Sequence, residues 1–223
     1  YNAGTTTIAE TVLSGNTARR GGAIASLTTP RKTFLYVDDT CISGNAADHG
    51  GAIAVDELVA GSALAAITNS TITGNFARVS RGGGIYAGPY ATVTIYNSIV
   101  AQNQAVIEGN DIYRWQREGV SEDLYAVIEG AHSLIGDGSG MVGISDGHNG
   151  NLVGTAQGPI DPKFVDPGKR DYRLTENSPA VDAGDKGAGR IHQRDTALLG
   201  FNERKKNPLY DRQPLLIPPV HGR

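Results

Sequence analysis

The chain is 223 residues long, carries a net charge of −3, and contains 30 glycines against only 6% aromatic residues. A slightly acidic chain offers no basic surface for nucleic acid or an anionic membrane, and no apolar run reaches the roughly 18 residues of a transmembrane helix. The length suits one domain, and the single cysteine, Cys41, excludes an internal disulfide.

The first half of the chain repeats one unit. Residues 11–25, 40–54 and 70–87 each run from a short apolar stretch through Gly-Asn to a Gly-Gly pair and a second apolar stretch, and residues 98–103 form a shorter fourth copy. The aligned asparagines recur at intervals of 29, 30 and 28 residues. They are Asn16, Asn45, Asn75 and Asn103. A self-match at a period of about 20–50 residues is the sequence signature of a stacked-repeat architecture.

Within each unit, β-branched residues form short runs bounded by Gly, Asn and Asp, which indicates strands and turns rather than helices. A unit of about 29 residues cannot bury its own apolar face, but stacking one unit on the next buries a continuous core. Three short strands per coil predict an all-β fold, a right-handed parallel β-helix. Two inward-facing columns are expected, one of Leu13, Ile42, Ile72 and Val100 and the other of Ile24, Ile53 and Ile85.

The four aligned asparagines are expected to lie one above another and to hydrogen-bond along the axis as a structural ladder. Asparagine also tolerates the left-handed backbone conformation of a tight corner. Pairs of glycines should form the second corner, where a positive φ or a close backbone approach excludes a Cβ. These pairs are Gly21 and Gly22, Gly50 and Gly51, and Gly83 and Gly84.

Residues 33–37, 63–68 and 91–96 alternate as half-buried strands do, and they supply the third strand of each coil. The repeat begins almost at Tyr1, before any segment long enough to cap a solenoid. We therefore expect the first coil to be covered by further coils or by a partner chain, because an open end leaves strand groups unpaired.

Residues 104–130 interrupt the period as an insertion and have the most distinctive composition in the chain. Repeat proteins carry insertions on one face, often the face that binds. Tyr113, Arg114 and Trp115 are therefore candidate ligand-binding residues. The alternative is a lengthened coil with a surface excursion, in which Trp115 packs against the solenoid wall.

A second candidate site lies at the corner of the second unit. Asp48 and His49 occupy the position that Arg19 and Arg20 hold in the coil before and Arg78 holds in the coil after. The arrangement fits a catalytic or ligand-binding site, and it also fits an exposed ladder of ion pairs that fixes the register of the coils. Asp48 and His49 are therefore candidate ligand-binding residues, and no catalytic residue is assigned.

The glycine-rich stretch 136–150 contains Asp137, Asp146 and His148, which could hold a metal ion. Their spacing matches neither the helix–loop–helix calcium loop nor the glycine-rich nonapeptide repeat. We therefore assign no metal ligand and expect no cofactor, with Ca²⁺ as the alternative.

After residue 160 the prolines are too closely spaced for a central strand. Segments 172–174 and 180–183 are expected to close the C-terminal end of the core, so the predicted β-helix domain spans residues 1–200. Four prolines in residues 201–223 predict an extended tail that wraps the solenoid or reaches a neighbour.

The motif Ser-Gly-Asn-x-Ala, followed by Gly-Gly-Ala-Ile, resembles the β-helix repeat of polymorphic outer-membrane proteins. The order of motifs at residues 97–103, 132–137, 160–164 and 178–185 is similar to that of bacterial choice-of-anchor Q domain-containing proteins. This second resemblance covers roughly residues 11–200. It implies an exported, right-handed β-helix at the bacterial cell surface, and it supplies no catalytic residues.

Two functions from different classes follow. We favour a non-enzymatic, secreted bacterial protein, a structural or adhesive subunit of a cell surface or extracellular assembly that self-associates by stacking coil ends. The alternative is a polysaccharide-binding or polysaccharide-degrading β-helix, a lyase or glycoside hydrolase. In that case carboxylates and a base would converge on one groove lined by aromatic side chains, drawn from Tyr86, Tyr90, Tyr96, Tyr113 and Trp115.

Overall fold

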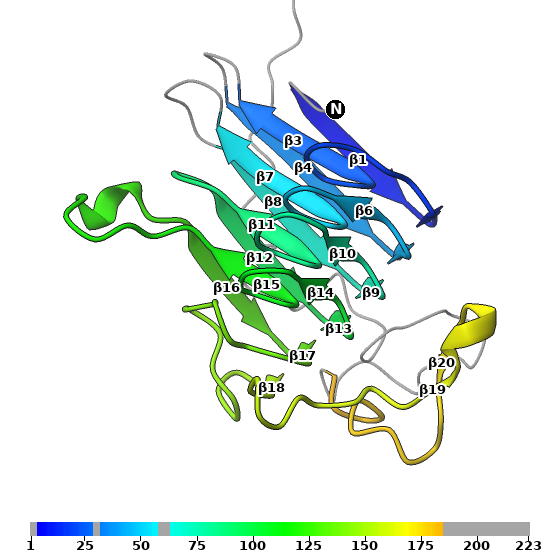
Figure 1. Cartoon of the computed structure of the whole chain (residues 1–223). Coiled ribbons are helices and arrows are strands. Elements are labelled where there is room, and N and C mark those ends of the chain that lie inside the picture. The colour runs from blue at the N-terminus through cyan, green and yellow to red at the C-terminus, as the bar shows by residue number, and fades with distance from the viewer. Residues whose placement is uncertain (1–3, 29–31, 58–62, 185–223) are drawn as a thin grey trace, which may run out of the picture.

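The computed structural model describes residues 4–28, 32–57 and 63–184, so the predicted tail at 201–223 lies outside the described residues. Over these ranges the chain winds through short strands that stack coil upon coil (Figure 1). The strands are β1 (Thr5–Ala9), β2 (Val12–Ser14), β3 (Ile24–Thr28), β4 (Thr33–Asp38), β5 (Cys41–Ser43), β6 (Ala46–Ala47), β7 (Ile53–Glu57), β8 (Ala63–Thr68), β9 (Thr71–Thr73), β10 (Phe76–Ala77), β11 (Ile85–Ala87), β12 (Thr92–Tyr96), β13 (Ile99–Ala101), β14 (Gln104–Ala105), β15 (Ile112–Arg114), β16 (Val127–Ala131), β17 (Leu134–Ile135), β18 (Leu152–Val153), β19 (Phe164–Asp166) and β20 (Asp171–Leu174). Two short 3-10 turns are η1 (Glu122–Leu124) and η2 (Pro167–Lys169).

Four parallel sheets run along the stack, because strands at the same position of successive coils pair with one another. The five-stranded sheet has the order β1-β4-β8-β12-β16, and the four-stranded sheet β3-β7-β11-β15. The six-stranded sheet has the order β2-β5-β9-β13-β17-β18, and the three-stranded sheet β6-β10-β14. The predicted fold class, an all-β parallel β-helix, is therefore confirmed. Within the described ranges, no helix is both long and apolar enough to cross a bilayer.

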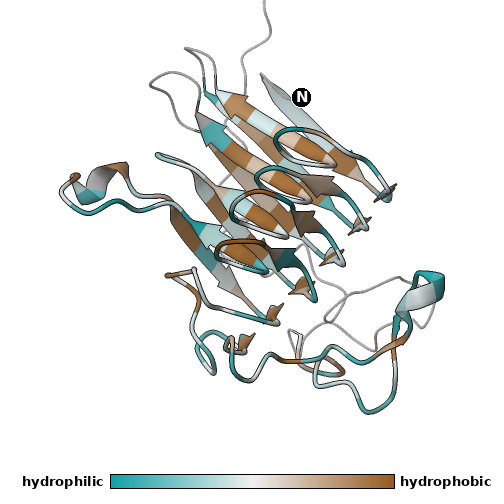
Figure 2. Ribbon diagram, viewed as in Figure 1, coloured by the Kyte–Doolittle hydropathy of each residue, from teal (hydrophilic) through white to brown (hydrophobic). Residues whose placement is uncertain are grey.

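The two predicted inward columns are confirmed by the strand register. Leu13 pairs with Ile42 in the six-stranded sheet, and Ile24 pairs with Ile53 in the four-stranded sheet, with the later members following in order. In the coils after the first, every side chain of both columns has 0% exposure. Figure 2 shows the resulting bands of apolar residues along the strands. Burying each such side chain contributes roughly 1.5–3 kcal/mol to stability.

The four asparagines form a hydrogen-bonded column inside the first corner. At each step the backbone N and the side-chain Nδ2 of one asparagine both donate to Oδ1 of the next, over 2.9–3.0 Å. Nδ2 of Asn45, Asn75 and Asn103 also donates to a carbonyl of the coil before, over 2.9–3.0 Å. Each buried amide therefore uses its donors and its acceptor between coils, as buried polar groups must.

The left-handed backbone conformation expected of these asparagines is found instead at the residue before each of them. The φ angles there lie between 60° and 71°, at Gly15, Gly44, Gly74 and Gln102. Glycine is the usual residue at such an angle because it has no Cβ to clash. The asparagines therefore serve the corner through their side-chain amides rather than through a left-handed backbone.

A second polar ladder, which the sequence analysis did not predict, runs along the corner between the five-stranded and six-stranded sheets. The hydroxyl of each member accepts the backbone N–H of the coil before, over 3.1–3.3 Å, at Ser70, Ser98 and Ser133. Each hydroxyl also donates to the carbonyl two residues earlier in its own coil. The signal was present in the sequence, since Thr40, Ser70 and Ser98 each precede a ladder asparagine by the same interval.

Both ladders end on residues from outside the repeated motif. Asp111 Oδ1 accepts N and Nδ2 of Asn103, over 3.0 and 2.8 Å, as a further asparagine would, and its Oδ2 accepts the backbone N–H of Asp137 over 2.6 Å. In the second ladder, Asn151 Oδ1 accepts the backbone N–H of Ser133 over 3.1 Å. Burial raises the pKa of Asp111 to about 7, because the charged form loses its hydration and these hydrogen bonds offset only part of that loss.

The glycine pairs divide the two expected roles between them. The first glycine has a positive φ, 58° at Gly21, and the second lies so close to the next coil that a Cβ on Gly22 would overlap the carbonyl of Gly51. In the third unit this pair is Gly82 and Gly83, not Gly83 and Gly84 as the sequence suggested. The third unit has two extra residues between its asparagine and its glycines, and its third glycine, Gly84, made the register ambiguous.

Residues 104–130 contain regular strands as well as an excursion. β14, β15 and β16 fall inside this range and pair with strands of the coils before them. The projecting part is confined to residues 115–126, which run out from the end of β15, through η1, to the start of β16 (Figure 1).

The C-terminal segment predicted to close the end of the core lies along its side instead. Segment 172–174 forms part of β20, which pairs antiparallel with β19. Tyr172 packs in one cluster with Cys41 of the six-stranded sheet, and Arg170 Nη1 donates to Ser14 Oγ in the first coil over 3.2 Å. The physical reason is that the six-stranded sheet has apolar side chains on its outer face as well, so this face also needs to be covered.

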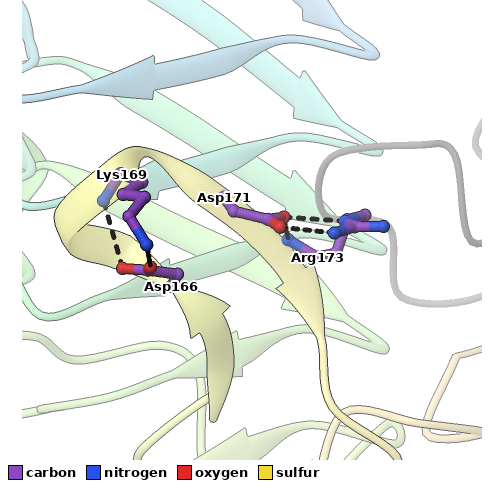
Figure 3. Close-up of polar contacts among 4 residues, drawn as sticks. All are labelled: Asp166, Lys169, Asp171 and Arg173. Carbon is purple, nitrogen blue, oxygen red and sulfur yellow. Dashed lines mark hydrogen bonds and ion pairs between the residues drawn. The ribbon is translucent and has the colours of Figure 1, made fainter.

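Local ion pairs hold the turn between β19 and β20 (Figure 3). Asp166 accepts the backbone N–H of Lys169 over 3.2 Å and pairs with its Nζ over 2.8 Å. Arg173 pairs with Asp171 in the same strand, and this hydrogen-bonded pair lowers the pKa of the Asp171 carboxyl. These contacts are exposed, so they define the shape of the turn more than they stabilise the fold.

Candidate functional site

Charged side chains form a column at the margin of the four-stranded sheet. Isolated parallel β-bridges pair the backbone of Arg20 with that of His49 in the next coil, and the backbone of Arg81 with that of Glu108 in the coil after its own. The N–H of Gly50 donates to the Arg81 carbonyl over 3.1 Å, which joins the two halves. Arg81 Nε lies 3.3 Å from a Glu108 carboxylate oxygen, with both side chains exposed to solvent.

Aromatic rings stand beside this column on the outer face of the same sheet. The strand register places Tyr86 directly over Tyr113, with ring centroids 5.5 Å apart and an interplanar angle of 21°. His49 meets the Tyr86 ring edge to face at 5.7 Å, and the Arg81 guanidinium lies 5.2 Å from the centroid of Tyr113. The earlier coils have Ala25 and Ala54 at this position, so the aromatic stack belongs to the later coils.

An ion pair between Arg20 and Asp56 crosses the sheet near these rings. The Asp56 side chain is only 9% exposed, whereas that of Arg20 is 37% exposed. A carboxylate at this depth needs a cation or strong donors, because desolvation penalises its charged form. Arg20 therefore helps to hold Asp56 in place, and its own head remains in contact with solvent.

His49 lies inside this charged and aromatic group, and its environment lowers its pKa below the usual value. Burial is the main cause, and the positive charge of Arg20 acts in the same direction, while Asp56 and Asp48 oppose it. The imidazole is therefore neutral at pH 7, when one ring nitrogen donates a hydrogen bond and the other accepts one.

The carboxylate of Asp56 lies directly over Gly88, and this contact gives a stability prediction. A Cβ on Gly88 would overlap Asp56 Oδ1, while the φ of Gly88 is one that alanine adopts readily. We expect Gly88→Ala to displace the carboxylate from Arg20 and to lower the unfolding free energy by about 1–3 kcal/mol in urea titration. Gly4→Ala is the control, because a Cβ there meets nothing within 4 Å. Equal stability of the two variants would show that Asp56 can move at no cost.

The predicted site residues divide among three places. Tyr113 and His49 join one group through Tyr86, as described above. Asp48 lies at the adjacent corner, 3.4 Å from Arg78, which is the inter-coil ion pair that the sequence allowed as the simpler interpretation. Tyr113 has only 6% exposure and both its ring contacts are internal, so it offers no free ring face to a ligand.

Arg114 and Trp115 lie at the base of the excursion rather than in the aromatic stack. Trp115 meets Tyr125 edge to face at 6.2 Å, and the Arg114 guanidinium lies 5.3 Å from the centroid of the same ring. Arg114 Nε also donates to the carbonyl of Ala126 over 2.6 Å. These contacts tie the two ends of the excursion together, so Trp115 packs within the excursion.

Sequence reasoning placed Arg20 over His49, as the structure does, but it missed Asp56 and Arg81 as members of the group. Arg20 and Asp56 are 36 residues apart, which is one full coil plus the length of a strand, so no local motif links them. Arg81 was missed because the third unit has two extra residues before its glycines, so the sequence comparison aligned Arg78 with Asp48 and His49. The sequence feature that could have indicated Asp56 is the glycine at position 88, because the absence of a side chain there leaves room for the Asp56 carboxylate of the neighbouring coil.

The glycine-rich stretch 136–150 does not form a metal-binding cluster in the part of the chain that the structure describes, where no group of three or more His, Cys, Asp or Glu side chains is positioned to hold an ion. Asp137 accepts a hydrogen bond from Asn110 over 2.9 Å, and Asp146 accepts one from the backbone N–H of Val153 over 2.9 Å. Both carboxylates thus have structural partners, and the expectation of no cofactor, with Ca²⁺ as the alternative, stays a prediction.

The chain matches no protein-family model, no curated protein and no solved structure. The resemblance to choice-of-anchor Q domain-containing proteins and to polymorphic outer-membrane-protein repeats therefore remains a prediction from the sequence motifs.

Proposed function

We propose that the chain is a non-enzymatic β-helix exported by a bacterium, where it serves as a structural or adhesive subunit of a cell surface or an extracellular assembly. The observation that carries the proposal is the way the coils are locked together. Two polar ladders run beside the apolar columns, so each coil is fixed to the next by side-chain amides and hydroxyls as well as by strand pairing.

Such a stack suits a mechanical role. Its stability comes from contacts between neighbouring coils, so side chains on the outer faces can vary from coil to coil without disturbing the core. The outward charges found at the corners form pairs between coils, as Arg78 does with Asp48 and Arg81 with Glu108. The motif resemblance described above adds the expectation of export.

The two ends of the stack differ, which bears on the expected end-to-end association. At the C-terminal end of the ladders, Asp111 accepts the hydrogen bond of Asn103 and Asn151 accepts that of Ser133. Asn16 is the first member of the ladder among the described residues, and its N and Nδ2 donate to Asn45. End-to-end association is therefore proposed for the first coil.

The test is location on the producing cell. An antibody raised against the described coils should label intact cells, and mild protease treatment of intact cells should remove the label. A strain lacking the protein should attach less well to surfaces or show an altered outer layer. Labelling that appears only after permeabilisation would contradict the proposal.

A second candidate function, polysaccharide binding or degradation, is favoured by one observation. His49, Tyr86 and the Arg20–Asp56 pair lie together on one outer face, which combines a neutral imidazole, a partly exposed tyrosine and a guanidinium. Affinity electrophoresis against a panel of neutral and acidic polysaccharides tests binding, and ultraviolet absorption of unsaturated products tests lyase activity. Unchanged mobility and no products across the panel would exclude this candidate.

A further inference from the structure

Residues 137–146, between β17 and β18, close the C-terminal end of the core, and we call them the cap. Ile144 is buried in the main core cluster, and Met141 packs against the same cluster. The N–H of Arg114, in the last strand of the four-stranded sheet, donates to the carbonyl of Gly140 over 2.8 Å. The cap therefore covers apolar side chains and also takes up a backbone donor at the edge of β15.

A buried polar junction fastens the cap to the coil above it. The N–H of Asp137, where the cap begins, donates to Asp111 Oδ2 over 2.6 Å, and Asn110 Nδ2 donates to Asp137 Oδ2 over 2.9 Å. Asp137 Oδ1 accepts the N–H of Ser139 over 2.9 Å, within the cap itself. The exposed fractions of Asp111 and Asp137 are only 1% and 4%. The junction thus holds two buried carboxyl groups in one hydrogen-bonded cluster.

The junction offers the Asp111 carboxylate hydrogen bonds but no opposite charge. Asn103 faces it from the ladder, and Gly136 lies against its Oδ2 on the side of the cap. Within the described ranges, Asp137 is the one titratable group recorded as acting on it, and its negative charge adds to the effect of burial in raising the pKa of Asp111. A buried carboxylate beside a second carboxylate is stabilised when it binds a proton or when water reaches it.

We propose that the cap is a pH-sensitive closure, which stays seated while Asp111 is protonated and lifts off the end of the stack more readily once Asp111 is ionised. Lifting the cap lets water reach the carboxylate, so the open state binds the proton less tightly than the closed state. Opening must therefore be favoured as pH rises from about 4 to about 7, and must level off above that. The inference goes beyond the proposed structural role and does not depend on it.

The experiment is hydrogen exchange of the full chain between pH 5 and pH 8, corrected for the intrinsic pH dependence of amide exchange. At residues 137–140 the equilibrium constant for opening should be on the order of a hundredfold larger at pH 8 than at pH 5. Exchange there should also be faster than in β9 and insensitive to low concentrations of urea, because local opening exposes little surface. Equal rates and equal urea dependence in the cap and in β9 would overturn the inference, since the cap would then open only when the whole chain unfolds.

Two variants assign the pH dependence to the junction. Asp111→Asn cannot titrate, so exchange at residues 137–140 should no longer vary with pH after correction, although losing an acceptor for the N–H of Asp137 raises exchange at every pH. Asp166→Asn is the matched control, because its ion pair with Lys169 is exposed and lies in the turn between β19 and β20. It should keep the wild-type variation. A wild type whose corrected exchange is the same at pH 5 and pH 8, or an Asp111→Asn variant that keeps the variation, would also overturn the inference.

Discussion

Replacing Asn75 by alanine is expected to lower the free energy of unfolding by about 3–5 kcal/mol, the largest effect of any single substitution in the ladder. Asn75 Oδ1 accepts both N and Nδ2 of Asn45, and its own Nδ2 donates to Asn103 and to the carbonyl of Ile42. Removing this amide leaves several buried donors and acceptors unpaired, and each costs roughly 1–3 kcal/mol. Chemical denaturation followed by circular dichroism measures the change.

The matched control is Gln104→Ala, which removes a similar amide from an exposed position of the next coil. It should change stability by no more than about 0.5 kcal/mol. If Asn75→Ala lowered the unfolding free energy no more than this control, the column of amides would not contribute measurably to the stability of the fold.

The second expected result concerns pH. Asp111 has a folded-state pKa of about 7, above the roughly 3.9 of an exposed aspartate, so between these values the folded chain binds more protons than the unfolded chain. Stability must therefore rise as pH falls through this window and be lost as pH rises through the folded pKa. Between pH 8 and pH 5 the gain from Asp111 is about 2–3 kcal/mol.

Comparing Asp111→Asn with the wild type isolates this contribution. Asparagine can still accept from Asn103, as the other members of the ladder do, but it does not titrate. The variant should lose the gain in stability between pH 8 and pH 5, while Asp166→Asn, at an exposed ion pair, should keep it. His49 acts in the opposite sense, since its lowered pKa makes the folded state less stable at low pH, and it is common to all three proteins. A wild-type profile with the same slope as Asp111→Asn would contradict the assignment.

The fold class and its inward columns could be predicted from the sequence because a solenoid repeats its environment at every coil. A residue at a given position contacts its own equivalents, so Ile42 and Ile72 must both be apolar, and Asn45 and Asn75 must both carry an amide. Residues that contact each other between coils are therefore separated in the sequence by one coil, which gives a period of about 29 residues. The third strands, β4, β8 and β12, followed from the same logic.

The candidate site could be predicted only in part. Asp48 and His49 stood out because they are charged or titratable at a position of the repeat, yet the structure separates them, with Asp48 toward Arg78 and His49 toward Tyr86. The partner of Arg20 could not be found from the repeat, because Asp56 occupies a different position of its coil. Outward-facing side chains meet diagonally across the sheet, and such contacts leave no period in the sequence.

The sequence by itself determined the stacking of coils, the two apolar columns and the column of asparagines, because each depends on contacts between equivalent positions. Only the tertiary structure decided how the stack ends and how it is covered. Asp111 takes the place of a fifth asparagine, although it follows Asn103 by only eight residues, and β20 folds back along the side of the core. The physical reason is that any segment within reach can accept the hydrogen bonds of unpaired donors or cover an exposed apolar face. The repeat shows that such a segment is required, but it does not determine which residues provide it.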